Sequence, residues 1–247
     1  MSASDATLQV RDLITGYGGL PIVNGVSLTA KPGQVTVVIG PNGCGKSTTM
    51  RAVSGLLPVT AGEVRLARNG TGAGLETLSP SERLALGLSF VPQERTGFPD
   101  MTVHENLALG GWLWRRKRAE LEPRLTRVYD ALPKLREWRD RRMGLLSGGQ
   151  QKLVELGRAL VSTPSVILLD EPTAGVAPAA AEELLGLLRE IAERDHVAVL
   201  MVEQNLEPAL RAADHAYCLV AGRNSTEGEA ADVLGRLEEI VESWLWT

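Results

Sequence analysis

The sequence predicts an α/β fold built around a parallel sheet. Six short apolar runs are typical of strands, and several are continuously apolar, as in strands that are buried on both faces of such a sheet. Helical patterns lie between them, and this alternation is typical of α/β proteins. The expected strands are residues 35–40, 63–67, 88–91, 165–170, 197–202 and 216–220.

Helices are expected between these strands. Ser79, Pro80 and Glu82 are typical of a helix start, with serine as the N-cap, proline in the first turn and glutamate completing a capping box. The glycine-rich stretch 69–74 predicts a loop or a hairpin. The expected helices are residues 46–55, 79–86, 121–135, 147–161, 179–194 and 207–213.

Residues 92–146 depart from the alternation and predict a helical subdomain inserted into the core. From Arg115 to Arg142 the chain has eleven Lys and Arg against five acidic residues, an excess of six positive charges. Two interpretations stay open: a solvated helical face, or a face near anionic lipid headgroups or an acidic partner.

Composition limits the other possibilities. A chain of 247 residues with 44% hydrophobic residues can bury a substantial core as one large domain. Its cysteines, Cys44 and Cys218, lack a paired-ligand spacing, so we expect a reducing cytoplasm and neither a disulfide framework nor structural zinc. We expect no membrane span and no secretory signal, and the formal net charge of −4 argues against nucleic-acid binding.

A glycine-rich stretch between an expected strand and an expected helix matches the phosphate-binding pattern G-x-x-x-x-G-K-[ST]. Its glycines let successive backbone N–H groups face inward, and the helix start adds positive potential, so the stretch is suited to a polyphosphate. Lys46 would reach the β- and γ-phosphates, and the Ser47 hydroxyl would bind Mg²⁺. The residues are Gly40, Pro41, Asn42, Gly43, Cys44, Gly45, Lys46 and Ser47, with Thr48 directly after them.

Two acidic residues end the expected strand 165–170. Asp170 lies at the strand's last position and Glu171 follows it. Beside a phosphate loop, one carboxylate can hold Mg²⁺ and the other can polarise the attacking water. We therefore assign Asp170 to the metal and Glu171 as the general base.

A second helix start is also suited to an anion. Ser147 is placed to cap the helix, and Gly148 and Gly149 behind it leave the first turn bare of side chains, with Gln150 next. One chain cannot easily bring both this helix start and the phosphate loop to one nucleotide, which indicates binding across a dimer.

Together these motifs resemble the ATP-binding subunits of ABC transporters: Walker A at 40–48, the LSGGQ signature at 146–150 and Walker B with its glutamate at 166–171. The resemblance covers essentially the whole chain as one domain, 1–247. It implies a P-loop NTPase core with an antiparallel β part and an inserted helical subdomain, and ATP and Mg²⁺ as ligands. It also implies that Tyr17 stacks on adenine and that Gln93 contacts Mg²⁺ and couples to a membrane subunit.

Within this family, residues 101–111, residues 157–178 and VEQN (202–205) are similar to importers of branched-chain amino acids, amides or urea. That resemblance implies a peripheral subunit at the cytoplasmic face of the membrane. Its implied partners are a second ATPase subunit, two membrane-spanning permease subunits and a periplasmic or extracellular substrate-binding protein. A heterodimer is expected, although a homodimer stays possible, and the basic helical lobe would dock on the membrane subunit.

Two positions depart from the family pattern. Ala177 stands where an aspartate is usual, and Gln204 stands where a histidine usually contacts the γ-phosphate. An amide can donate a hydrogen bond but cannot become cationic, so we expect retained but slower hydrolysis. The alternatives are a non-transport ABC ATPase and a nucleotide-binding scaffold with little turnover.

We expect no catalytic role for the three histidines, His104, His196 and His215. We expect the WLW run at 244–246 to pack on the core.

Overall fold

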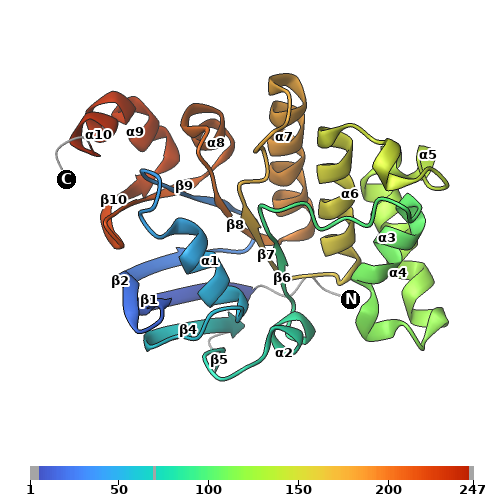
Figure 1. Cartoon of the computed structure of the whole chain (residues 1–247), viewed down its shortest axis with the longest axis horizontal. Coiled ribbons are helices and arrows are strands. Elements are labelled where there is room, and N and C mark those ends of the chain that lie inside the picture. Colours follow the sequence, from blue (N-terminus) through green and yellow to red (C-terminus); the bar gives the residue numbers. More distant parts are fainter. Residues whose placement is uncertain (1–5, 69–70, 245–247) are drawn as a thin grey trace.

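The computed structural model describes residues 6–68 and 71–244. Their strands form two sheets, one of six strands and one of four (Figure 1). The six-stranded sheet has the order β10-β9-β3-β8-β7-β6. All its neighbouring pairs are parallel except β9 and β10. The strands are β3 (Val35–Ile39), β6 (Leu88–Val91), β7 (Val166–Asp170), β8 (Ala198–Val202), β9 (His215–Val220) and β10 (Arg223–Glu229).

The central strands of this sheet confirm the prediction from continuous apolarity. Every residue of β3, β7 and β8 is buried, because helices and the second sheet cover both faces. Parallel strands point the same way, so their carboxyl ends lie along one edge of the sheet. Asp170 is the last residue of β7, and Glu203 follows the end of β8 at that edge.

The four-stranded sheet is antiparallel, with the order β2-β1-β4-β5. The strand expected at 63–67 lies in this sheet, and the hairpin interpretation of 69–74 is confirmed where β5 pairs with β4; residues 69–70 lie outside the described residues. The two longest strands, β1 and β2, were not among the expected strands. The strands are β1 (Ala6–Tyr17), β2 (Leu20–Ala30), β4 (Ala61–Arg68) and β5 (Thr71–Gly74).

Five expected helices are confirmed to within about two residues at each end. Ser79 and Ser147 cap two of them, each as part of a capping box. The helices are α1 (Lys46–Ser54), α2 (Pro80–Ala85), α6 (Gly148–Val161), α7 (Pro178–Asp195) and α8 (Leu206–Ala212).

The single helix expected at 121–135 is wrong. The chain forms α4 (Arg118–Ala131), leaves helical geometry at Leu132 and begins α5 (Pro133–Glu137). Proline disfavours helical geometry in the residue before it and lacks the N–H that a continuing helix needs, so Pro133 starts a new helix.

Residues 92–146 contain only short helices and turns, apart from one bridge between Thr102 and Arg142. Here α3 (Val103–Gly110), α4 and α5 pack beside α6 at one end of the molecule (Figure 1). At the other end lie α9 (Ala230–Gly235) and α10 (Leu237–Trp244). Trp244 packs against the core as expected, whereas Leu245 and Trp246 lie outside the described residues. None of the described helices combines the length and apolarity that a membrane crossing requires.

Helix α1 packs between the two sheets, and a buried arginine holds its end. Arg83 of α2 donates from Nη1 to the carbonyls of Ala52 and Val53, both at 2.7 Å, and from Nε to that of Leu78 at 3.0 Å. The last carbonyls of a helix have no partner within the helix, and a cation there also interacts favourably with the negative end of the helix dipole. Arg83 therefore fixes the helix that follows the phosphate loop.

Candidate active site

The phosphate loop joins β3 to α1. Gly40 has a φ of 152° and Gly45 a φ of 103°, conformations that side chains rarely adopt. A Cβ at Gly40 would lie 2.1 Å from the carbonyl oxygen of Leu219, so the close approach of β9 also requires glycine. The Lys46 ammonium donates to the carbonyls of Gly40 at 2.7 Å and Pro41 at 3.0 Å. The loop thus wraps around a buried cation.

Ser47 and Asp170 meet beside this loop. Ser47 Oγ donates to Asp170 Oδ1 at 2.9 Å, joining the start of α1 to the end of β7. Burial raises the pKa of Asp170, the hydrogen bond from Ser47 opposes that shift, and the neighbouring Glu171 charge adds to it. A hydroxyl and a buried carboxylate side by side suit Mg²⁺, which takes oxygen ligands and is typically held by one or two carboxylates plus substrate phosphates.

Glu171 accepts hydrogen bonds on both carboxylate oxygens. Gln93 Nε2 donates to its Oε2 at 2.5 Å, and Gln204 Nε2 donates to its Oε1 at 2.6 Å. The backbone of Glu171 has a φ of 49°, a costly conformation for a side-chain-bearing residue that is often found at functional sites. The structure thus brings together three residues that the sequence separates widely.

These three residues line one cavity of about 370 Å³, together with the loop that follows β7 and the end of β8. Lys46, Ser47 and Asp170 are not among its lining residues, but Asp170 adjoins Glu171 in the chain. A phosphate chain held at the loop would thus end beside a carboxylate whose two oxygens are already oriented.

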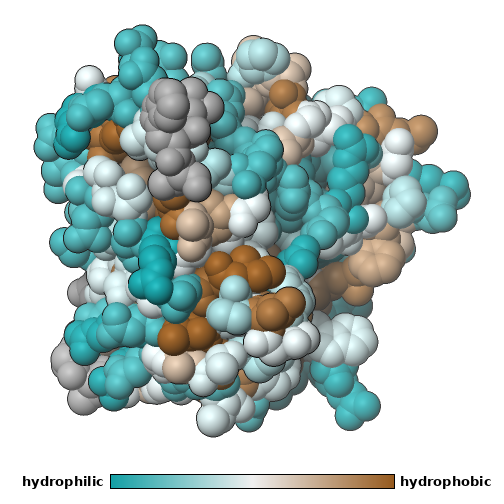
Figure 2. All heavy atoms as spheres, turned by 60° about the vertical axis from the view of Figure 1, so that its left-hand side comes forward, coloured by the Kyte–Doolittle hydropathy of each residue, from teal (hydrophilic) through white to brown (hydrophobic). Residues whose placement is uncertain are grey.

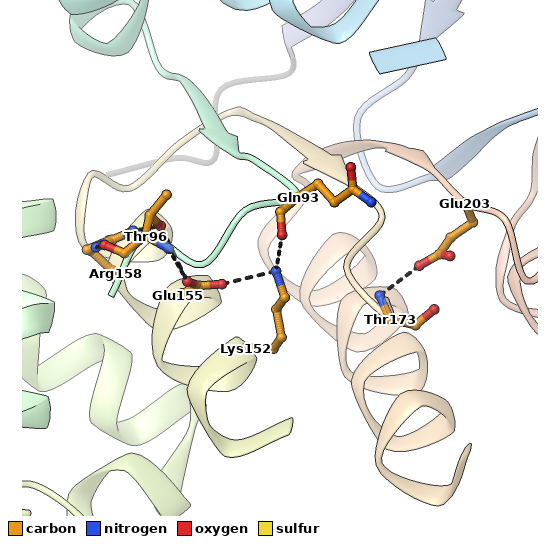
Figure 3. Close-up of polar contacts among 7 residues, drawn as sticks. All are labelled: Gln93, Thr96, Lys152, Glu155, Arg158, Thr173 and Glu203. Atoms are coloured by element: carbon orange, nitrogen blue, oxygen red, sulfur yellow. Dashed lines mark hydrogen bonds and ion pairs between the residues drawn. The ribbon is translucent and has the colours of Figure 1, made fainter. Parts of the chain in front are cut away.

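Glu203, a residue without a predicted role, is buried at this site. Its Oε1 accepts from the Thr173 N–H at 2.8 Å (Figure 3). Its Oε2 accepts from the Gln204 N–H at 3.2 Å. Burial raises its pKa. Glu203 therefore ties the loop after Glu171 to the backbone of Gln204. An acidic residue directly after an apolar strand, the pattern that identified Glu171, was the available signal.

Tyr17 lies at the end of β1 and is 43% exposed. Its hydroxyl accepts from Arg51 Nη1 at 3.2 Å, so it lies beside α1. Leu20 and Ile22 are exposed on the adjoining β2. Figure 2 shows a hydrophobic area over this side of the molecule among hydrophilic surroundings. Such a surface suits the face of a nucleotide base.

Helix α6 begins as predicted. Ser147 accepts from the Gln150 N–H at 3.4 Å, and Gln150 Oε1 accepts from the Ser147 N–H at 2.9 Å. Gly148 and Gly149 leave the first turn without side chains. Within the described part of the chain, no hydrogen bond joins this helix start to the phosphate loop. None of these four residues lines the cavity beside Glu171.

Cys44 and the three histidines make no hydrogen bond to Glu171 in the described part of the chain. Burial raises the pKa of the Cys44 thiol, which makes it a small loop residue rather than a reactive group. His104 hydrogen-bonds to Tyr129 at 2.9 Å, His215 packs on Tyr217, and His196 ends α7.

Comparisons with known proteins identify the family of this chain. Residues 23–174 match the family model described as ABC transporter. The chain is 36% identical to a probable branched-chain amino acid transport ATP-binding protein, LivF, of Archaeoglobus fulgidus, over 92% of this chain and 94% of that protein. It is 35% identical to the high-affinity branched-chain amino acid transport ATP-binding protein BraG of Pseudomonas aeruginosa, over 85% and 87%. An sn-glycerol-3-phosphate import ATP-binding protein of Cereibacter sphaeroides is 32% identical, over 94% and 64%.

Solved structures give the same result for the fold. The ADP conformation of an ATP-binding cassette of an ABC transporter has a TM-score of 0.85 at 32% identity, covering 97% of this chain and 98% of that one. A nucleotide-free ATP-binding cassette has a TM-score of 0.83 at 30% identity, covering 96% and 98%. The similarity thus extends over both sheets and all the helices around the site.

Proposed function

Because the chain belongs to the ABC transporter family of ATP-binding proteins, we propose that it powers an importer of branched-chain or other hydrophobic amino acids, amides or urea. The chain is an ATPase whose hydrolysis is coupled to transport. The substrate class rests on the similarity to LivF and BraG over most of both chains. The observation that carries the mechanism is Glu171, held by two amides next to the Ser47–Asp170 pair.

In this proposal the phosphate loop and Lys46 bind the β- and γ-phosphates, and Tyr17 stacks on adenine. Ser47, Asp170 and Gln93 would hold Mg²⁺, which would neutralise the charge that develops on the phosphates. The loop's backbone N–H groups and the start of α1 favour the anion, with Thr48 in the first turn. Lys46 would exchange its carbonyl partners for phosphate oxygens.

Glu171 takes the proton of the attacking water. The two amide hydrogen bonds hold the carboxylate in a fixed orientation beside the place where the water would lie. Each carboxylate oxygen keeps a second lone pair that can accept the water's proton, and the second N–H of the Gln204 amide can donate to the γ-phosphate. Its amide stays neutral, so transition-state charge receives less stabilisation than an imidazolium would give, and hydrolysis is slow.

Each nucleotide is bound between this chain and a partner ATPase subunit. Ser147, Gly148, Gly149 and Gln150 face that subunit's nucleotide, as their separation from this chain's phosphate loop supports. We propose a heterodimer, because Gln204 and Ala177 make this site slow and a different subunit can supply the faster one. ATP closes the pair and hydrolysis reopens it.

The membrane subunits dock on the helical side of the chain. A groove of about 390 Å³ lies between the core and the helices of 92–146, which we take as the helical subdomain of a single domain, 1–247. Leu56, Leu84 and Leu109 line it, and Leu56 is 59% exposed. The groove suits a helix of a permease at the cytoplasmic face of the membrane, with a substrate-binding protein delivering cargo on the other side.

The complex purified through a tag on this chain from its own cells tests the proposal. We expect a second ATPase and two membrane subunits to copurify, and phosphate release that rises when a loaded binding protein is added to the reconstituted complex. Phosphate release no faster than in a Lys46→Ala complex would instead indicate a scaffold. An active complex without membrane subunits would indicate a non-transport ATPase.

A further inference from the structure

Three charged residues of α6 hold the chain segment that carries Gln93 (Figure 3). Lys152 Nζ donates to the Gln93 carbonyl at 3.0 Å and pairs with Glu155 Oε2 at 3.2 Å. Glu155 Oε1 accepts from the Thr96 N–H at 2.7 Å. Arg158 donates from Nη1 to the Thr96 carbonyl at 2.8 Å and from Nη2 to the Thr96 hydroxyl. The backbone of residues 93–96 is thus fastened to one face of α6.

The pair at the centre of this network is buried. The side chains of Lys152 and Glu155 are 7% and 1% exposed, and in the described part of the chain Glu155 Oε2 has no polar partner besides the Lys152 ammonium. A buried ion pair costs so much desolvation that an apolar pair of similar volume is often at least as stable. Such a pair is therefore better explained by the geometry that it imposes than by the stability that it adds.

That geometry leads to the reacting carboxylate. Lys152 holds the Gln93 backbone, and Gln93 Nε2 reaches Glu171 Oε2 at 2.5 Å. The same helix begins at Ser147, fewer than two turns before Lys152. One rigid helix therefore connects the bare SGGQ turn at its start with the amide that orients Glu171.

We propose that Lys152 and Glu155 are positioning residues that make the start of α6 and Gln93 move as one unit. When a nucleotide at the partner subunit shifts the start of α6, the pair moves Gln93 with it and so changes the orientation of Glu171. The two nucleotide sites are thereby coupled through this chain's own α6. The inference rests on the proposed function, because it assigns the α6 start to the partner's nucleotide.

The test replaces both partners together, Lys152→Met with Glu155→Met, which avoids leaving one buried charge unpaired. In the purified complex we expect kcat for ATP to fall between about tenfold and 100-fold, since small misplacements of reacting groups have effects of this size. KM for ATP should stay within about twofold, because the phosphate loop is untouched. The Thr96 amide should lose protection against hydrogen exchange.

The same double substitution in a Gln93→Ala variant shows whether the pair acts by positioning Gln93 or by stabilising the fold. If the pair acts through Gln93, then adding the double substitution to Gln93→Ala causes no further loss of kcat. The matched control is Arg236→Met with Glu239→Met, an exposed pair at the same i, i+3 spacing, which should leave kcat unchanged.

Each outcome decides the inference. A multiplicative loss in the Gln93→Ala background, an unchanged kcat, or retained protection of Thr96 overturns it. A wild-type complex as inactive as Lys46→Ala overturns the proposed function instead, and hydrogen exchange at residues 93–96 then still decides whether the pair fastens Gln93 to α6.

Discussion

Replacing Gln204 with histidine is expected to accelerate hydrolysis at this site. The Gln204 amide donates to Glu171 Oε1 at 2.6 Å and stays neutral at every pH. Imidazole has a similar reach, keeps an N–H donor and can become cationic near neutral pH. The substitution therefore tests whether charge at this one position limits the rate.

The magnitude follows from the kind of hydrogen bond. A neutral hydrogen bond contributes about 0.5–1.5 kcal/mol net and a bond to a charged group about 1.5–3 kcal/mol. The difference, about 1–2 kcal/mol in the transition state, corresponds to an acceleration of about 5- to 30-fold. Since a histidine side chain has an ordinary pKa of about 6.5 and is cationic below it, the acceleration should be larger at pH 6 than at pH 8.

The assay is single-turnover hydrolysis, with the complex in excess over radiolabelled ATP, at several pH values. Gln204→Met is the matched control, because it keeps the side-chain length without a donor, and it should be slower than wild type. A histidine variant that binds ATP normally but hydrolyses no faster than wild type at any pH refutes the reasoning.

Three further predictions concern stability and nucleotide binding. Arg83→Met should lower the free energy of unfolding by about 3 kcal/mol in urea titrations, because the buried Val53 carbonyl loses its donor and the Ala52 carbonyl keeps only the Gly55 N–H; an unchanged midpoint contradicts this. Burial raises the pKa of Glu203 above its ordinary value of 4.5. Ionising Glu203 therefore lowers the stability of the folded protein, and this cost is absent at low pH and grows as pH rises from 4.5 through the raised pKa. Glu203→Gln should accordingly gain stability relative to wild type from pH 4.5 to 8, and a difference independent of pH contradicts this. Gly40→Ala should abolish ATP binding in equilibrium titrations whereas Gly228→Ala, at an open position, should not.

The parts of the site that depend on local spacing could be predicted from the sequence. The phosphate loop, the acidic end of β7 and the Ser147 cap are each set within a few consecutive residues. Gln93 and Gln204 followed from resemblance to a family, because nothing local in the chain places them against Glu171. Their meeting depends on the parallel order of β6, β7 and β8.

The rest was missed for identifiable physical reasons. No residue of β10 is buried, and the buried residues of β1 and β2 are interrupted by partly or fully exposed ones, so none of these strands gives a continuous apolar run. Lys152 and Glu155 lie within a helical pattern, where charged residues are expected at the surface unless a partner is known. Burial of such a pair depends on a distant segment, here residues 93–96.

Single-turnover hydrolysis by the purified complex carrying Glu171→Gln tests the role of Glu171 most directly. The Lys46 loop and the Ser47–Asp170 pair remain in this variant, so ATP affinity should match wild type. The rate should fall about 100-fold or more, because the general base is gone. Hydrolysis at the wild-type rate with ATP bound would contradict the assignment of Glu171 and with it the mechanism.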